Sequence, residues 1–223
     1  MTTGATLVAH GGAVPVTRAQ LAGIPAPQST ATWRPIAHAE LVDLRQDRLA
    51  AAGWSVAREQ YAVQSDGKKL FGTFDLENGH ALGEGLGAAL GFRHGNDKSM
   101  ALQAVAGARV FVCDNLALSG ETQVFREKHQ HGVYARLREA LGRYFGGLGQ
   151  ALDLVRDRFG LWQAASLTDE QAKVVIYDAI AEGIVPSRIR PEIHAAYFRA
   201  EALGYADCAP RTKLGLHNAF TRS

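Results

Sequence analysis

Apolar side chains recur every three or four positions between residues 134 and 159, and this is the most regular pattern in the chain. Such spacing places them on one face of an α-helix of about seven turns, which must bury that face against a partner. The pair Gly146-Gly147 interrupts the pattern at a place where a helix can kink. The apolar positions are Tyr134, Leu137, Leu141, Tyr144, Leu148, Leu152, Val155 and Phe159.

The chain beyond that helix also carries helical signals. Thr168 and Gln171 have the spacing of a capping box, which predicts the start of a helix. Pro191 suits the first turn of another helix, and residues 212–221 predict a last short one. We therefore expect a helical C-terminal half.

The first half of the chain alternates between strand and turn signals. Leucine spacing predicts a helix over residues 37–52, followed by strands over 54–64, 69–76 and 87–92. The sequence Ser65-Asp66-Gly67-Lys68 is typical of a hairpin turn, because Asp-Gly tolerates positive φ. These segments predict an antiparallel meander.

A polar turn and a run of small residues follow the meander. Asn96 or Asp97 can cap a helix that runs to about Gly107, and strands are predicted over 109–114 and 121–129. Clustered strands followed by clustered helices indicate an α+β fold rather than a parallel βαβ sheet. We expect an antiparallel β-meander of three to five strands, packed on a helix and followed by a helical C-terminal half.

This pattern divides the chain into three regions. Four prolines restrict the backbone of residues 1–35, which are predicted to form an extended N-terminal arm. Residues 36–132 are predicted to form an α+β core with the order β-β-β-α. Residues 133–223 are predicted to form a helical region that packs on the core or extends it.

Composition excludes several classes of protein. The net charge of +2 sets no global preference for nucleic acid, and two cysteines are too few for a disulfide scaffold or a four-cysteine zinc site. No apolar run approaches the roughly 20 residues that span a bilayer. We expect a cytoplasmic protein that has no membrane partner and no cofactor.

Basic residues in the predicted turns and strands indicate a binding surface. Such side chains neutralise a phosphate backbone, and the free N–H groups of a helix start at Asn96 would suit a phosphate. An ordinary solvated surface is the alternative. The strand phenylalanines are more typical of a core than of a base-stacking platform; they are Phe71, Phe92, Phe111 and Phe125. The predicted nucleic-acid-binding residues are Arg93, Lys98, Arg109, Arg126, Lys128, Lys68 and Lys69.

No stretch of the chain matches a catalytic motif. The glycine-rich residues 83–87 lack the ending of a phosphate loop, and Ser119-Gly120 lacks a nucleophile elbow. We predict no catalytic residue and no metal ligand. A metal-dependent nuclease stays open as an alternative, although the spacing of its candidate ligands fits no established site. Those candidates are His94, Asp97, Asp114, His129 and His131.

Several stretches carry a resemblance to a known family. They are Asn96-Asp97-Lys98-Ser99, residues 108–116, residues 35–41, Phe71-Gly72 and residues 216–221. On these residues the chain resembles the phage- and plasmid-like domain-of-unknown-function family from about residue 17 to the C-terminus. That family commonly reads Arg-Asn-Ser-His-Asp-Lys-Ser, whereas residues 93–99 here read Arg-His-Gly-Asn-Asp-Lys-Ser. The resemblance implies an origin in a mobile element and carries no established activity.

The predicted order of elements is also similar to the β-β-β-α core of the single-strand annealing recombinases of the RecT, Redβ and Erf groups. In those proteins a basic groove holds single-stranded DNA, and the subunits form rings or filaments. This likeness implies a non-enzymatic, oligomeric phage or plasmid protein that binds and anneals single-stranded DNA. Its partners would be single-stranded nucleic acid and further copies of itself. The alternatives are a phage- or plasmid-encoded interaction protein or inhibitor of a host system, and the metal-dependent nuclease.

Overall fold

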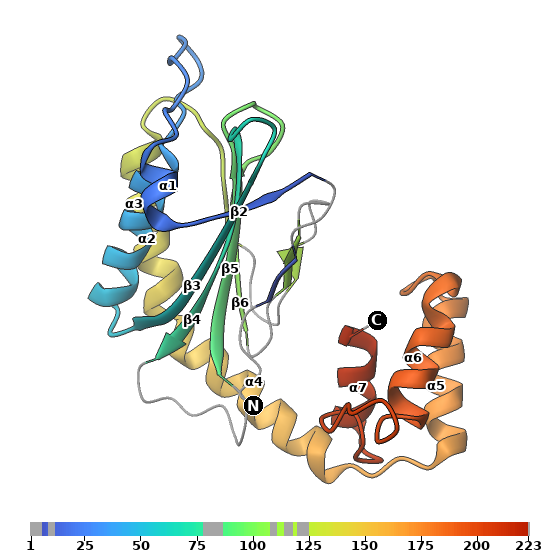
Figure 1. Cartoon of the computed structure of the whole chain (residues 1–223). Helices are drawn as coiled ribbons and strands as arrows, with labels where there is room; N and C mark the ends of the chain where they lie inside the picture. The colour runs from blue at the N-terminus through green and yellow to red at the C-terminus, as the bar shows by residue number, and fades with distance from the viewer. Residues whose placement is uncertain are drawn as a thin grey trace. The chain divides into compact units, whose positions relative to one another are not determined.

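The structure is a computed structural model of the whole chain, and it describes residues 6–8, 12–77, 87–107, 111–113, 118–119 and 125–222 (Figure 1). The chain divides into two compact units, Met1–Val155 and Arg156–Ser223. In the described ranges, no helix combines the length and the apolar character needed to cross a membrane.

The first unit is built on a six-stranded antiparallel sheet with the order β2-β3-β4-β5-β6-β9. Its strands are β2 (Val14–Val16), β3 (Ser55–Gln64), β4 (Lys69–Glu77), β5 (Ala88–Gly95), β6 (Leu102–Gly107) and β9 (Phe125–Glu127). A smaller sheet has the order β1-β7-β8. It consists of β1 (Thr6–Val8), β7 (Phe111–Cys113) and β8 (Leu118–Ser119). Contacts of its strands with β4 and β5 place the smaller sheet against one face of the larger one.

Two helices cover the other face of the large sheet (Figure 1). They are α2 (His38–Ala51) and α3 (Val133–Gly146), which pack against each other. The rings of Phe74 and Phe92 lie beneath them, edge to face, with centroids 4.8 Å apart. A Cβ atom on Gly72 would lie 2.4 Å from the Phe92 ring, so only glycine fits opposite it.

The sheet has six strands, and the expectation of three to five is therefore wrong. The additional edge strand, β2, comes from residues expected to form an extended arm, and it pairs with β3 through Val14 and Val63. A short helix, α1 (Arg18–Ala22), follows it and buries Leu21. The N-terminal segment thus supplies packed elements, because its apolar side chains reach the core. The predicted domain boundaries after residues 35 and 132 stay predictions.

The helix expected between Asn96 and Gly107 is also wrong, because the small residues of this run form β6. This strand lies between β5 and β9, and its side chains are buried on both faces of the sheet. Alanine favours helices in isolation, but a strand covered on both faces also accepts small side chains. The predicted order β-β-β-α has a helix after the third strand of the meander. In the structure a fourth strand, β6, takes that place.

The polar residues before β6 form a turn instead of a helix cap. The side-chain amide of Asn96 donates to the carbonyl of Ile36 at 2.8 Å and accepts from its N–H at 3.3 Å. The Asp97 carboxylate accepts from both the N–H and the hydroxyl of Ser99. Lys98 has a φ of +65°, in the left-handed region, so the backbone cannot continue as a helix there.

The long apolar repeat forms two helices instead of one kinked helix. They are α3 and α4 (Leu148–Ala164), and Gly147 is the C-cap between them. The second unit continues with α5 (Asp169–Ala181), the 3₁₀-helix η1 (Ser187–Ile189), α6 (Arg190–Phe198) and α7 (Lys213–Arg222). Its core includes Ile176, Ile193, Tyr197 and Leu216. Helices in the C-terminal half and an antiparallel sheet before them confirm the α+β class.

The capping box predicted at the start of α5 is confirmed. The Thr168 hydroxyl accepts from the N–H of Gln171 at 3.2 Å, and the Gln171 side chain accepts from the N–H of Thr168 at 2.9 Å. Thr168→Ala removes one of these two bonds, so we expect the free energy of unfolding of the second unit to fall by about 1 kcal/mol. Urea unfolding followed by helical circular dichroism measures this loss. Thr168→Ser, which keeps the hydroxyl, should retain most of the stability; equal losses in the two variants would contradict the cap.

Candidate nucleic-acid interface

A hollow of about 460 Å³ lies at one end of the large sheet, and we call it the end groove. Three segments line it: the chain before α2, the turn between β5 and β6, and the chain at and after β9. These segments are far apart in the sequence and meet because β6 pairs with both β5 and β9. The lining residues are Thr32, Trp33, Lys98, Ser99, Met100, Ala101, Arg126, Lys128, His129 and Gln130.

Three of the seven predicted cations line the end groove. Lys98, Arg126 and Lys128 are exposed, and none of the described lining residues is acidic. The two acids adjacent to these cations in the sequence both have partners: Glu127 accepts from Arg136 Nε at 2.8 Å, and Asp97 accepts from Ser99 and lies 3.6 Å from Lys69 Nζ. The groove therefore presents an excess of positive charge that is not balanced from within its own lining.

The side wall of the end groove carries an aromatic ring that the sequence analysis missed. Trp33 is half-buried, and Lys98 Nζ lies 5.1 Å from its ring centroid. A second ring, His129, lies 6.4 Å from Trp33 and is tilted by 47°. The sequence did carry a signal for Trp33: it lies between prolines in a polar segment. A tryptophan there does not belong to the apolar face of a helix or strand, which favours a role at the surface. Cations next to an aromatic ring suit phosphates and bases together.

Two more predicted cations lie on the sheet face that the small sheet covers. Strand register places Arg93 opposite Gln103, and Gln103 opposite Arg126, so the three share one face. Arg93 Nε donates to Gln103 Oε1 at 2.6 Å. Lys69, also on this face, lies 3.6 Å from a carboxylate oxygen of Asp97. These cations are held in internal contacts, outside the end groove.

Asp97, the partner of Lys69, remains ionised in its turn. Burial alone would raise the pKa of its carboxyl, but hydrogen bonds from Ser99 and the charge of Lys69 lower the pKa below its ordinary value. Of the remaining predicted cations, Lys68 is exposed in the β3–β4 turn, and Arg109 lies outside the described residues. The structure thus places Lys98, Arg126 and Lys128 in the lining of the end groove, whereas Arg93, Lys68 and Lys69 do not line it.

The candidate metal ligands do not form a metal centre in the described part of the chain. His94 and His129 are buried, with stacked rings 5.5 Å apart, whereas His131 is exposed. The Asp97 carboxylate is engaged by Ser99, and Asp114 lies outside the described residues. Across the described ranges, no three His, Cys, Asp or Glu side chains are placed to hold a metal ion.

Three histidines instead form a buried layer behind the end groove. His38 Nδ1 lies 2.7 Å from His94 Nε2, and His38 Nε2 lies 2.5 Å from the carbonyl oxygen of Gly67. His129 Nδ1 lies 3.2 Å from the carbonyl oxygen of Arg34. Burial lowers the pKa of all three rings, that of His94 most strongly, so they are neutral near pH 7.

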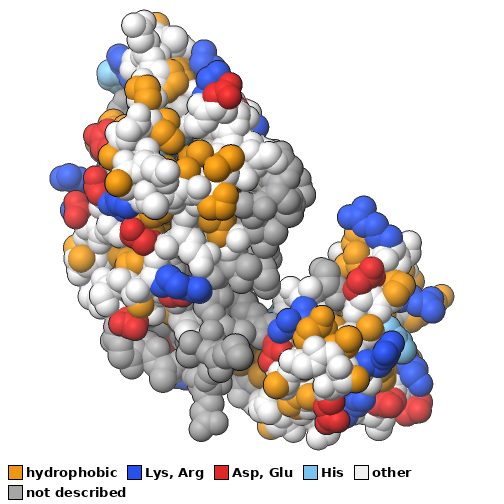
Figure 2. Space-filling view, viewed as in Figure 1, with side chains coloured by type: hydrophobic (Ala, Val, Ile, Leu, Met, Phe, Trp, Pro, Cys, Tyr) orange, Lys and Arg blue, Asp and Glu red, His pale blue; other side chains and the backbone are white. Residues whose placement is uncertain are grey.

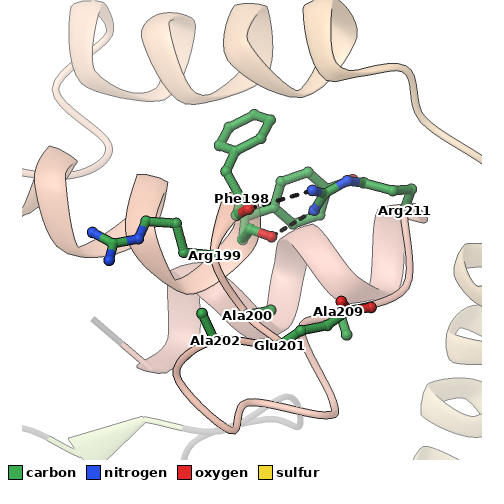
Figure 3. A pocket seen from close by; sticks show the side chains of 8 residues that line it. Phe198, Arg199, Ala200, Glu201, Ala202, Ala209 and Arg211 are labelled. Carbon is green, nitrogen blue, oxygen red and sulfur yellow. Dashed lines mark hydrogen bonds between the residues drawn. The ribbon is translucent and has the colours of Figure 1, made fainter.

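A second hollow, of about 370 Å³, lies in the second unit and also contains basic side chains (Figure 3). Its central cation, Arg211, is committed to the fold. The guanidinium donates to the carbonyls of Tyr197 and Phe198, and Nε lies 3.2 Å from Asp169 Oδ1. The lining also contains Glu201, whose negative charge further reduces the net positive charge of this hollow. This hollow suits an anion less well than the end groove does.

Elsewhere, opposite charges are mixed on the surface. In the view of Figure 2, Lys and Arg side chains are interspersed with Asp and Glu on each unit. A third hollow, of about 470 Å³, contains Glu40, Asp43 and Asp47 of α2 beside Arg138, and its lining is therefore acidic. Of the three hollows, the end groove alone has basic but no acidic lining residues among those described.

The chain matches one family model over most of its length. The family is described as a domain of unknown function, DUF932, and its model matches residues 28–219. The match includes every lining residue of the end groove. No curated protein and no solved structure matches the chain.

Proposed function

Because this chain belongs to the DUF932 family, a domain of unknown function, we propose its function from its own surface: it binds single-stranded nucleic acid in the end groove. The observation that carries the proposal is the meeting of three cations with one accessible aromatic ring. Lys98 comes from the turn between β5 and β6, and Arg126 and Lys128 come from the chain at and after β9; all three line the same hollow as Trp33.

The chemistry of the groove favours a strand over a lone anion. The cations neutralise backbone phosphates, which supplies affinity that does not depend on sequence. The face of Trp33 offers a base a stacking surface, and the neighbouring Lys98 adds a cation. Duplex DNA would bind less well, because its bases are already stacked on each other.

Annealing and self-association are the finer parts of the proposal. A strand held mainly by its phosphates leaves most of its bases free to pair with a second strand. Annealing two strands requires several grooves side by side, which a homo-oligomer supplies. We propose a non-enzymatic protein of a phage or plasmid that acts in the cytoplasm in this way.

Oligonucleotide binding at varied salt tests the proposal. We expect a labelled single-stranded oligonucleotide to bind with an affinity that falls steeply between about 50 and 200 mM salt. Three phosphate contacts predict a slope of about −2 in a plot of log affinity against log salt concentration. Fluorescence anisotropy measures both quantities, with duplex DNA as the comparison. Absence of binding at the lowest salt, or equal affinity for the duplex, would overturn the proposal.

A further inference from the structure

Arg45 points from the apolar face of α2 into the interior of the first unit. It takes a position between Leu41 and Leu49 on that face, and its guanidinium carbon lies 4.5 Å from the centroid of the Phe92 ring. The side chain is completely buried. None of its three nitrogens has a hydrogen-bond partner among the described residues. An ion buried without a partner is among the least favourable arrangements in a protein.

The described core contains no buried Asp or Glu, and two acids near this helix face have other partners. Asp43 of α2 forms an ion pair with Arg18 on the outer side of the helix. Glu59 of β3 accepts hydrogen bonds from Tyr61 and Gln46. Burial lowers the pKa of Arg45 to about 9, which still leaves the guanidinium charged at pH 7. The described interior therefore holds a positive charge without a negative counterpart.

Hydrogen bonds fix the tautomers of the neighbouring histidines. A carbonyl oxygen can only accept, so His129 carries its proton on Nδ1 and His38 carries its proton on Nε2. The His38 Nδ1 atom must then accept, so His94 carries its proton on Nε2. His94 Nδ1 and His129 Nε2 are left as bare nitrogens, buried and without a partner among the described residues. Either nitrogen becomes a donor when its ring takes up a proton.

We propose that the cluster of Arg45, His94 and His129 is a binding site for a small inorganic anion, for which chloride is the probe. Arg45 supplies up to five N–H donors that nothing else in the described chain uses. Arg45 lies over the ring of Phe92, and His94 is two residues further along β5 on the same face, stacked on His129. The charge of Arg45 accordingly lowers the pKa of both histidines. A bound anion neutralises the charge of Arg45, so that one histidine ring can take up a proton. The protonated ring then donates a hydrogen bond to the anion. Binding is therefore coupled to proton uptake.

The anion must be small, because Arg45 and His94 are buried and line none of the three hollows described above. Phe92 and Leu41 are 0% exposed, as are Arg45 and His94. A halide loses less hydration on burial than a multiply charged phosphate, which makes chloride the better fit. The site does not depend on the end groove, although His129 borders both.

Thermal unfolding in chloride and in gluconate at equal ionic strength tests the proposal. For the wild-type chain we expect Tm to rise with chloride concentration, and we expect this chloride-dependent increase to be larger at lower pH, because a proton is bound with the anion. Arg45→Met keeps an unbranched, flexible side chain and removes the guanidinium and its charge. This variant should show no chloride response, and in gluconate its stability should equal or exceed that of the wild type.

Lys128→Gln is the matched control, because it removes a cation from the end groove and leaves Arg45 in place. It should keep the full chloride response. Equal Tm values in the two salts for the wild type, or an unchanged response in Arg45→Met, would overturn the proposal. Should Arg45→Met fail to fold, diffraction from bromide-soaked crystals of the wild type decides the matter. An anomalous peak in contact with the Arg45 guanidinium supports the site, and its absence there overturns it.

Discussion

Replacing Lys98, Arg126 and Lys128 together by glutamine is expected to weaken the binding of single-stranded oligonucleotides by roughly 100-fold. Each cation contributes about 1 kcal/mol or more when it faces a phosphate, and glutamine keeps much of the side-chain length without the charge. Because fewer counterions are released, the slope of log affinity against log salt should also become shallower by about 2. Anisotropy titrations at several salt concentrations measure both changes.

A control with the same change in net charge separates the groove from a general electrostatic effect. Lys173, Arg188 and Arg199 are exposed in the second unit and lie outside the end groove. Their joint replacement by glutamine should alter affinity less than about 3-fold, since exposed charges that do not line the groove make no direct contact with a strand bound there and are screened by salt. If this control weakened binding as much as the groove variant does, the end groove would not be the binding site.

Acidification below pH 6.5, the ordinary pKa of histidine, is expected to destabilise the first unit steeply. In the unfolded chain His38, His94 and His129 take up protons near that pH. In the folded chain burial lowers the pKa of each ring, so the folded state resists protonation. Their stabilisation is therefore fully present above pH 6.5 and is lost as the pH falls through the folded pKa values.

The acid effect is large because three rings act together. Each proton taken up on unfolding lowers the free energy of unfolding by up to about 1.4 kcal/mol per pH unit, so three rings contribute up to about 4 kcal/mol per unit. Urea unfolding over a range of pH in gluconate measures this slope without anion binding. His94→Gln should reduce the slope by about one proton, whereas His131→Gln, at an exposed position, should not. A stability that did not change between pH 7 and pH 5 would contradict the buried neutral layer.

Local signals in the sequence predicted much of the secondary structure. The hairpin at residues 65–68 has positive φ at Ser65, Asp66 and Gly67, as its Asp-Gly pair favours. The Thr168 capping box needed only residues three apart. Leucine spacing predicted α2 to within a residue at each end. These features depend on neighbours within one or two turns, so composition and spacing are sufficient to identify them.

The failure at residues 96–107 has a tertiary cause. Ala101, Ala104 and Ala106 have high helix propensity, and Asn96 is a good N-cap residue, so every local signal favoured a helix. Pairing with β5 and β9, together with burial on both faces, outweighed this preference. The side-chain amide of Asn96 forms hydrogen bonds with the backbone of Ile36, 60 residues away, and therefore does not cap a helix.

The sequence predicted only part of the candidate site, again because long-range contacts complete it. Lys98, Arg126 and Lys128 could be named as cations near turns and strand ends, but their meeting with Trp33 depends on strand pairing between distant segments. Arg45 had a signal that was overlooked: it falls on the apolar stripe between Leu41 and Leu49, where a charge is out of place. A cation in such a stripe points either to a buried partner or to a ligand.

The sequence alone determined α2, the start of α5, the hairpin and the α+β class, because each rests on spacing within a short window. Tertiary structure alone decided the sixth strand, the end groove and the buried cluster around Arg45. Each of these requires residues far apart in the sequence to come together; His129 and the carbonyl of Arg34, for example, are 95 positions apart. Long-range pairing and burial set their energy, and no local pattern encodes which distant partner a side chain will meet.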